Sequence, residues 1–390
     1  MEMKTYKIGD LYTVSNGLSK GKAFFGQGYP FLTFSEVMNN FFIPETLQSL
    51  VQTEDKERVR FSIKRGDIFL NRTSETADEL GISCVALKDY PNATFNGFCK
   101  RLRPISEVVV PEYIGYYLRT NAFRKHMSAL SGNMITRASL RNEQLLSIEI
   151  ELPSKEVQLK IANILRQYDL MIDNCTQQIA LLEEAAQRLY REWFVNLRFP
   201  GYETTPIGEN GLPEGWRYEK VGNLLQKVKR SLLIQAVEYH ETGRLPIIDQ
   251  SRKFIAGYTD NLDAKVNEKL PIILFGDHTR ILKFITFDFA RGADGTQLII
   301  SSNVEQMPQC LFFLSLKHID LSNYSYTRHF KYLKEEKIIL PTEKIAQMFE
   351  NKISEYFGGI NILLKMHNRT LRIRDLLLPR LISGQIEIKA

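Results

Sequence analysis

The feature that most constrains this chain is one long stretch of regular hydrophobic spacing, from Ser154 to Phe194. Apolar or nearly apolar side chains recur there at alternating steps of four and three residues, which is typical of a long helix that packs lengthwise along another helix. Ser154 can cap the start, and no helix-breaking residues follow until Phe199–Gly201. At about 1.5 Å per residue the helix would be roughly 60 Å long, longer than a small domain. The seam positions are Ile161, Leu165, Tyr168, Ile172, Cys175, Ile179, Leu182, Ala186, Leu189 and Trp193.

A second copy of this stretch provides a partner helix in the same chain. Leu340–Thr342 repeats Leu152–Ser154 at an offset of 341 − 153 = 188 residues. The same offset gives a second seam that is less regular, because Gly358–Gly359 weakens it and two of its positions are His and Arg. Its positions are Phe349, Ile353, Tyr356, Ile360, Leu363, His367, Thr370, Arg374, Leu377 and Leu381.

The segments that precede the two helices also begin alike. Lys7–Leu11 resembles Lys220–Leu224 at an offset of 222 − 9 = 213 residues. We therefore expect an α+β protein built as an internal repeat, because repeated self-similarity identifies a repeated structural unit. Two mixed α/β domains would be separated by two long antiparallel helices in a coiled coil, related by a pseudo-twofold axis. The alternative is two helical hairpins inside unrelated domains.

The expected boundaries follow from this repeat. Residues 1–150 form the first globular domain and residues 151–199 the central spacer helix. Residues 200–340 form the second globular domain, beginning with a linker at 200–215 that is rich in Gly, Pro and Asn. Residues 341–390 form the C-terminal spacer helix.

Composition limits the compartment and the class of protein. The chain has 390 residues, a formal net charge of +6, and 44% hydrophobic residues, which permits a polyanionic partner without requiring one. Its four cysteines are scattered, with neither a zinc-ligand spacing nor a disulfide framework. The polar start and the lack of a long apolar run predict a cytoplasmic protein that neither crosses nor binds a membrane.

Local patterns outline the first globular segment. Strand-like runs occur at 65–70, 82–87 and 147–152, and helical spacing at 111–130 places several aromatic residues near one face. That aromatic set fits a core better than a binding platform. A basic, polar loop at 130–137 follows, and its Gly, Asn, Thr and Arg residues could reach phosphates and base edges or simply form a surface turn.

The second globular segment has a similar arrangement. Apolar runs at 270–275, 281–285 and 297–300 are separated by the donor-rich segments 276–280 and 291–296. Tyr324–His329 precedes the last strand, as Thr136–Arg137 does in the first half. This parallel placement favours one purpose for both loops.

Catalytic patterns are weak throughout. Asp277–Thr279 could suggest a metal or hydrolase site, but no further His, Asp or Glu cluster completes it, so a structural or DNA-contact role is favoured. Phe24–Gly28 fits F-x-G-x-G, but the companion N/D-P-P-Y/F motif of aminomethyltransferases does not occur, and a glycine turn is the better interpretation. No phosphate-binding P-loop sequence occurs. We expect no catalytic residues and no metal.

Taken together, the chain resembles the specificity (S) subunit of type I restriction–modification systems over essentially its whole length. The most specific segments are Leu152–Pro153 with its helix to Glu192–Phe194, the opening Leu212–Trp216, and the ending Leu376–Gly384. The departure from the usual family pattern is the second helix, where Gly358–Gly359 and the polar seam positions put its straightness in doubt.

The resemblance implies function and partners. Each globular segment would be a target-recognition domain that reads half of a split site in double-stranded DNA. The helices would set the half-site distance and dock two methyltransferase (M) subunits, and restriction/translocase (R) subunits would join them. The chain itself would carry no cofactor, because S-adenosylmethionine, ATP and Mg are expected on the partner subunits.

Loop chemistry then predicts the DNA contacts. Donor-bearing side chains next to strand ends can reach phosphates and base edges. The predicted residues are Arg72, Thr73, Asn133, Thr136, Arg137 and Arg141 in the first domain and His278, Thr279, Arg280, Thr296, Thr327 and Arg328 in the second.

Two other functions remain possible from the residues alone. One is a coiled-coil scaffold with two protein-binding heads. A DNA affinity that falls steeply with salt would distinguish the specificity subunit from it, because phosphate contacts cause that fall. The other is a self-contained DNA modification enzyme, which the missing methyltransferase motif and P-loop disfavour.

Overall fold

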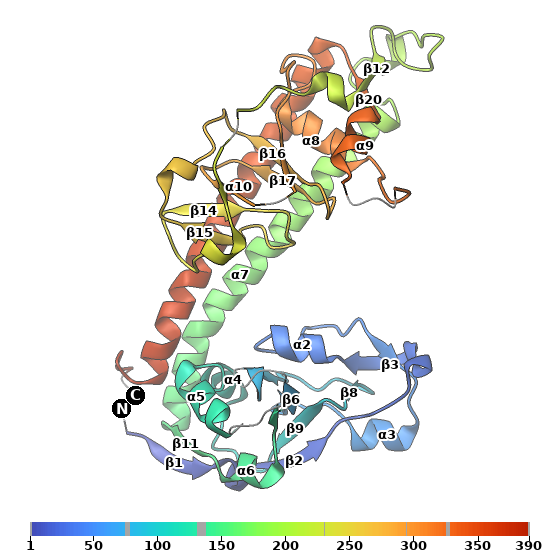
Figure 1. The fold of residues 1–390 in the computed structure, drawn as a ribbon. Helices are drawn as coiled ribbons and strands as arrows, with labels where there is room; N and C mark the ends of the chain where they lie inside the picture. The colour runs from blue at the N-terminus through green and yellow to red at the C-terminus, as the bar shows by residue number, and fades with distance from the viewer. Residues whose placement is uncertain are drawn as a thin grey trace. The chain divides into compact units, whose positions relative to one another are not determined.

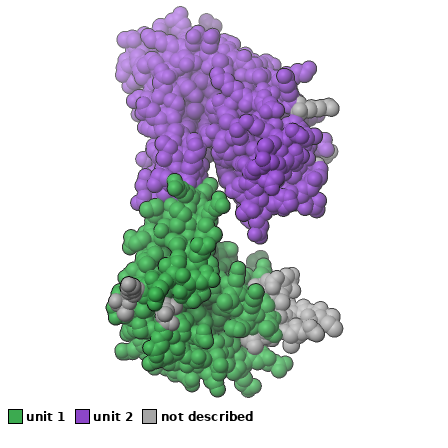
Figure 2. Space-filling view, turned by 90° about the vertical axis from the view of Figure 1, so that its left-hand side faces the viewer, with its two compact units in different colours: residues 1–173, 368–390 green, residues 174–367 purple. Residues whose placement is uncertain are grey.

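The computed structural model describes residues 2–74, 79–130, 138–229, 231–293, 295–324 and 328–388. Two compact units account for it, coloured separately in Figure 2. Unit 1 comprises residues 1–173 and 368–390, and unit 2 comprises residues 174–367. No helix in the described part of the chain combines the length and apolarity needed to cross a membrane.

Unit 1 is built on mostly antiparallel strands with short helices, and only β3 and β8 of its described strand pairs run parallel (Figure 1). A four-stranded sheet has the order β2-β9-β5-β7, with β2 Tyr12–Asn16, β9 Cys99–Pro104, β5 Ile68–Asn71 and β7 Ser83–Val85. A three-stranded sheet has the order β4-β3-β8, with β4 Leu50–Val51, β3 Phe25–Leu32 and β8 Thr94–Phe95.

Two further strand pairs and six short helices complete unit 1. The pairs are β1 Lys4–Lys7 with β11 Glu149–Leu152, and β6 Thr73–Ser74 with β10 Ala138–Ser139. The helices are α1 Ile8–Leu11, α2 Phe34–Asn39, α3 Asp55–Arg60, α4 Pro111–Tyr117, α5 Asn121–Leu130 and α6 Asn142–Ser147.

Unit 2 repeats the central part of this arrangement. A three-stranded antiparallel sheet has the order β17-β16-β19, with β17 Leu282–Ile285, β16 Ile272–Gly276 and β19 Thr296–Ile299. A second sheet has the order β13-β18-β14-β15, with β13 Leu233–Ile234, β18 Ala290–Gly292, β14 Leu245–Ile248 and β15 Gly257–Thr259. A further pair joins β12 Arg217–Lys220 to β20 Lys337–Leu340, and the helices are α8 Gln309–Lys317 and α9 Phe330–Glu335.

The predicted repeat is visible at atomic detail in the front ends of the units. The amide of Ile8 donates to the carbonyl of Ile148 at 2.9 Å. In the other unit, the amide of Val221 donates to the carbonyl of Glu336, also at 2.9 Å. Gly9 and Gly222 follow them, and a Cβ atom at either glycine would lie 3.1 Å from a backbone carbonyl oxygen of the opposing segment. The same close approach in both halves supports a common structural plan.

The two long helices are α7, Lys155–Tyr190, and α10, Glu343–Ile382, and they pack together. The unit boundary falls inside both helices, so each unit contains a section of each. In unit 1 Asp169 and Met171 bond to Arg374 and Thr370, respectively. In unit 2 the Trp193 ring, just beyond α7, lies 5.4 Å from that of Phe349, and Leu182 lies beside Gly359. Residues of increasing number along α7 therefore contact residues of decreasing number along α10, so the two helices are antiparallel.

The regular spacing of apolar residues along α7 and α10 explains why these helices pack together. All the predicted seam residues of α10 are buried or half-buried, His367 and Arg374 included. The helix continues through Gly358–Gly359, because the packing of its apolar face outweighs the roughly 1 kcal/mol by which each glycine disfavours a helix. Apolar residues of both helices join the main cores, with Leu165 and Leu381 in unit 1 and Ala186 and Phe349 in unit 2.

Two details differ from the sequence prediction. The single helix expected over 111–130 is broken between α4 and α5, where the side chain of Thr120 caps the second helix by accepting from the amide of Phe123 at 3.4 Å. The helix expected to continue to Phe199 ends its α-helical part at Tyr190 and closes with a π-helical turn, Arg191–Val195. That turn buries Trp193 and Phe194 in the core of unit 2.

Candidate nucleic-acid interface

In unit 1 the predicted residues that the structure describes, Arg72, Thr73 and Arg141, lie at one end of the four-stranded sheet. Asn16 ends β2 and pairs with Lys100, while Asn71 ends β5 and pairs with Cys99 at the start of β9. The chain therefore leaves β2 and β5, and enters β9, at the same end. We call this end the reading edge of unit 1.

Arg72 and Thr73 lie directly on this edge and are half-buried. The amide of Arg72 donates to the carbonyl of Phe98 at 2.9 Å, and its carbonyl accepts from the amide of Leu140 at 2.9 Å. Thr73 pairs with Ser139. The Arg72 backbone is therefore fixed, yet its Nε atom is buried with no hydrogen-bond partner in the described structure.

Arg141 is exposed at the start of α6 and makes no side-chain capping bond there. The neighbouring Asn142 side chain accepts a hydrogen bond from Lys100, so Arg141 belongs to the same edge. The predicted residues Asn133, Thr136 and Arg137 lie outside the described residues.

Lys100 is a member of this edge that the sequence reasoning missed. Its side chain is buried, and its ammonium group donates to Asn142 and, at 3.4 Å, to Asn16. Burial, and then the nearby Arg72, lower the pKa of Lys100. The only signal in the sequence was the alternation of Lys100-Arg101-Leu102-Arg103, in which Lys100 faces the edge while Arg101 and Arg103 bond to Ser62.

In unit 2 the matching end of the three-stranded sheet carries the second predicted set. β16 ends at Gly276, which pairs with Thr296 at the start of β19. His278, Thr279 and Arg280 follow β16 and are all exposed, and Arg328 is exposed as well. We call this end the reading edge of unit 2.

Asp277 holds this edge together. Its amide donates to the carbonyl of Gly295 at 2.6 Å, and its own carbonyl accepts from the amide of His329 at 2.9 Å. Its carboxylate accepts from the amide of Phe330 at 2.7 Å. These bonds join β16, the start of β19 and α9, and they place Arg328 beside the turn that carries His278. The structural role expected for Asp277 agrees with this network.

The turn itself is braced by Gln250. The side-chain oxygen of Gln250 accepts from the amide of His278 at 3.1 Å, and its carbonyl accepts from the hydroxyl of Thr279 at 2.8 Å. Gly295 has a φ of +68°, and a Cβ there would lie 2.5 Å from the His278 ring. Glycine is therefore needed for both reasons.

One predicted residue of unit 2, Thr296, does not join this exposed set. Thr296 is buried, and its hydroxyl donates to the carbonyl of Gly292 at 3.1 Å, so its side chain supports the turn from inside. Thr327 lies outside the described residues.

A metal site and a reactive thiol each require particular surroundings among the described residues. No group of three or more His, Cys, Asp or Glu residues in the described ranges could hold a metal ion. The four cysteines are free and buried, and burial raises the pKa of the Cys84, Cys99 and Cys310 thiols, which disfavours the reactive thiolate.

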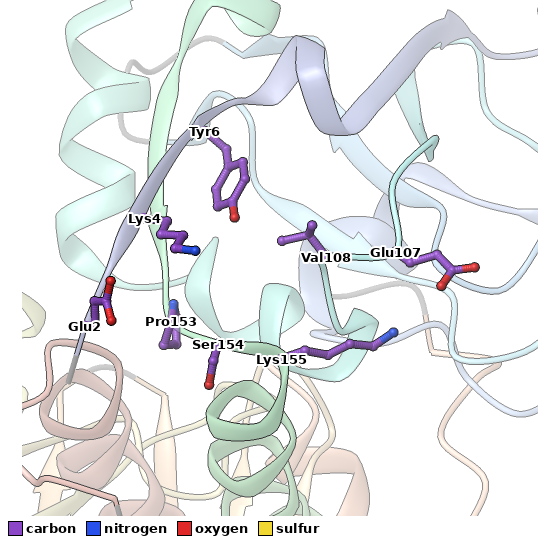
Figure 3. Close-up of a pocket in the computed structure, with 8 residues that line it drawn as sticks. All are labelled: Glu2, Lys4, Tyr6, Glu107, Val108, Pro153, Ser154 and Lys155. Carbon is purple, nitrogen blue, oxygen red and sulfur yellow. The ribbon is translucent and has the colours of Figure 1, made fainter. Parts of the chain in front are cut away.

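Unit 1 also has an open pocket of about 500 Å³ at the junction of β1 with the start of α7 (Figure 3). Two carboxylates and two ammonium groups line it, so its formal charge is zero and it has no preference for a polyanion. The lining residues are Glu2, Lys4, Tyr6, Glu107, Val108, Pro153, Ser154 and Lys155.

Comparison with known proteins gives the family. The family described as "Type I restriction modification DNA specificity domain" matches residues 1–184. The type I restriction enzyme MjaIX specificity subunit of Methanocaldococcus jannaschii is 26% identical, covering 99% of this chain and 93% of that protein. The HindI specificity subunit of Haemophilus influenzae is 26% identical over 50% of this chain and 41% of that protein.

A solved structure shows the same fold. The S subunit of a type I restriction–modification system from M. genitalium has a TM-score of 0.59 at 14% identity, covering 97% of this chain and 96% of that one. The mixed α/β domains, the two packed helices and the matching sequences agree with one another. Residues 1–184 therefore match the type I restriction modification DNA specificity domain, and the chain as a whole is similar to the specificity (S) subunits of type I restriction–modification systems.

Proposed function

We propose that each unit reads one half of a bipartite DNA site through its reading edge. The observation that carries this proposal is that both units expose cationic and hydroxyl side chains where equivalent strands end, β5 in unit 1 and β16 in unit 2. Such side chains can contact phosphates and base edges, and a fixed backbone limits the geometries they adopt. The exposed or half-buried contacts are Arg72, Thr73, Arg141, His278, Thr279, Arg280 and Arg328.

The domain roles follow from this proposal. Residues 1–150 and 200–340 act as recognition domains, and residues 151–199 and 341–390 act as spacers. Because both units share α7 and α10, the length of the helix pair fixes the spacer between the half-sites, as geometry does in other two-part DNA readers.

The partners of the complex complete the function. Two methyltransferase subunits dock to the helices, and restriction/translocase subunits join that core. The partners supply the chemistry that needs S-adenosylmethionine, ATP and Mg, while this chain positions the DNA. Base flipping, where methylation requires it, belongs to the methyltransferase.

A domain exchange tests the bipartite arrangement. Residues 1–150 are replaced by those of a relative with a different specificity, and modified adenines are mapped across the genome of cells that carry the partner subunits. We expect one half of a split motif to change while the other half and the spacer stay constant. A change in both halves, or an unsplit motif, contradicts the proposal.

Point variants test the reading edges themselves. Each phosphate contact contributes about 0.9 to the slope of log affinity against log salt, so Arg72→Ala and Arg328→Ala each lower the slope by roughly one. Arg244→Ala is the matched control, because Arg244 is exposed and lies just before β14, at the opposite end of that strand from Gln250. A scaffold with protein-binding heads would bind DNA weakly, and none of the three variants would alter its salt dependence.

A further inference from the structure

One exposed aromatic residue stands beside the reading edge of unit 1. Phe98 is 59% exposed and lies in the turn that connects β8 to β9. Its carbonyl accepts the hydrogen bond from the amide of Arg72 at 2.9 Å. The ring is therefore attached to the backbone that holds a proposed DNA contact.

The turn is rigid. The amide of Phe98 donates to the Asn96 side-chain oxygen at 2.8 Å, and the amide of Cys99 donates to the Asn96 carbonyl at 2.9 Å. A Cβ at Gly17 would lie 2.1 Å from the Asn96 carbonyl oxygen, and one at Gly97 would lie 2.3 Å from the Ser19 hydroxyl. The hydrogen bonds fix the backbone of the turn, and the two glycines let the neighbouring segment pack closely against it, so little backbone entropy is lost when the turn meets a ligand.

Two cationic residues adjoin the turn: Arg72, whose amide bonds to the Phe98 carbonyl, and Lys100, two residues beyond Phe98. Arg72 and Lys100 lie close enough for the charge of Arg72 to lower the pKa of Lys100, after the larger effect of burial. Lys100 is held by two neutral asparagine side chains, Asn16 and Asn142. An anionic ligand would relieve the repulsion between these cations, which favours DNA over an apolar protein surface as the partner of this edge.

A single exposed phenylalanine is common on protein surfaces and by itself indicates nothing. Here the ring is combined with a fixed turn and two cations. Further along the segment that contains Ser19, Phe24 and Phe25 are also exposed, at 44% and 39%. This combination fits the way proteins place apolar side chains against bases while cations contact the backbone.

We propose that the phenyl ring of Phe98 makes an apolar contact with the bases of the half-site read by unit 1. The inference rests on the proposed function and adds a base-contacting residue to it. Two kinds of base surface offer this chemistry: the face of a partly unstacked base and the methyl group of thymine.

The test uses the chain assembled with its methyltransferase subunits, on DNA carrying its mapped site, over a range of salt concentrations. We expect Phe98→Ala to weaken specific binding roughly tenfold, the scale of losing one aromatic–base contact, and to leave the salt slope unchanged. Ile105→Ala is the control, because Ile105 is also 59% exposed but follows the other end of β9. It should leave binding unchanged.

Two DNA probes separate the kinds of contact. A 2-aminopurine in the half-site should brighten on binding to the unsubstituted complex, but not to the Phe98→Ala complex, if the ring unstacks a base. Replacing thymine by uracil should remove the difference between the two complexes if the ring contacts a methyl group. Either result supports the proposal.

Three outcomes overturn it. One is an affinity of the Phe98→Ala complex within twofold of the unsubstituted one. Another is an affinity loss with an altered salt slope, or with no response to either DNA probe. The third is loss of methyltransferase subunits from the complex, which would mean that the ring faces a protein. If the unsubstituted complex shows no sequence preference, the proposed function fails instead.

Discussion

The two units anchor the same pair of helices by different chemistry. In unit 1 the contact is polar: the Asp169 carboxylate accepts from Arg374 at 2.8 Å and from the Tyr116 hydroxyl, and all three residues are largely buried. In unit 2 the contact is aromatic, with the Phe357 ring 4.5 Å from Phe284 and 5.8 Å from Phe313. A common backbone plan therefore does not impose common packing.

The difference also extends to the reading edges. The turn before β9 in unit 1 carries the exposed Phe98, whereas the segment before β19 in unit 2, residues 291–295, contains no aromatic residue. The strands that present these turns are nevertheless equivalent. Divergent edges on an equivalent scaffold agree with the proposal that the two units read different half-sites.

The largest loss of stability should come from removing the Asp169–Arg374 ion pair, which we call the polar anchor of unit 1. Arg374→Ala leaves the Asp169 charge buried without its cation, which should lower the free energy of unfolding by about 3–5 kcal/mol. Chemical denaturation measures it. The matched control is the exposed Arg372→Ala on the same helix, expected to change stability by less than about 0.5 kcal/mol. A loss below about 1 kcal/mol for Arg374→Ala would show that this ion pair is not an anchor.

Removing the Phe357 ring, the aromatic anchor of unit 2, should lower the free energy of unfolding slightly less. Phe357→Ala removes a mostly buried ring from two aromatic contacts, and we expect a loss of about 3 kcal/mol. Because no charge is involved, the loss should be the same at low and high salt. A strongly salt-dependent loss would contradict the distinction between the two units.

Gly9 and Gly222 test how alike the two units are. An added Cβ lies 3.1 Å from a carbonyl oxygen and 3.3 Å from a Cβ atom in each case, the partners being Leu146 and Lys334. Gly9→Ala and Gly222→Ala should therefore each destabilise by about 1 kcal/mol through overpacking. Thermal and denaturant unfolding of the two variants should agree within about 0.5 kcal/mol, and a larger gap would break the equivalence.

The smallest expected effect is a pH dependence confined to unit 2. The Glu350 carboxylate accepts from the amides of Cys310 and Leu311 at the start of α8, and burial raises the pKa of Glu350. In unit 1 a neutral side chain has the corresponding role. The side-chain oxygen of Gln158 accepts a 2.9 Å hydrogen bond from the amide of Val110, at the start of α4. An amide does not titrate, so only unit 2 should respond to pH through this contact.

The sign follows from the raised pKa. The native state holds the Glu350 proton more tightly than the unfolded state, so its stabilising contribution is complete below the unfolded pKa, near 4.3, and is lost as pH rises through the native pKa. The stability of Glu350→Gln relative to the unsubstituted chain should therefore increase from pH 4 to pH 7. The exposed Glu355→Gln on the same helix is the control, and a difference that stays flat with pH would refute the assignment.

Some of this protein could be predicted from its sequence, because helical periodicity and tandem repetition are local patterns. The seam of α7, its repeat in α10 and the matching starts at Gly9 and Gly222 all follow from residue spacing. The strands β7 and β17 lie within the expected apolar runs, and β5, β16 and β19 overlap theirs but extend one residue beyond them. Short buried strands need apolar residues, which is why the runs locate them. The same patterns led to the family through their order along the chain.

Only the tertiary structure decided which side chains these elements bring together. Asp169 and Arg374 are 205 residues apart, and no spacing rule pairs them. The burial of Thr296 and Lys100 and the exposure of Phe98 likewise depend on neighbours from distant segments. Periodicity records only the face of an element on which a residue lies. What that face meets is set by the long-range packing of the chain, which is why the scaffold was predictable and the details of the reading edges were not.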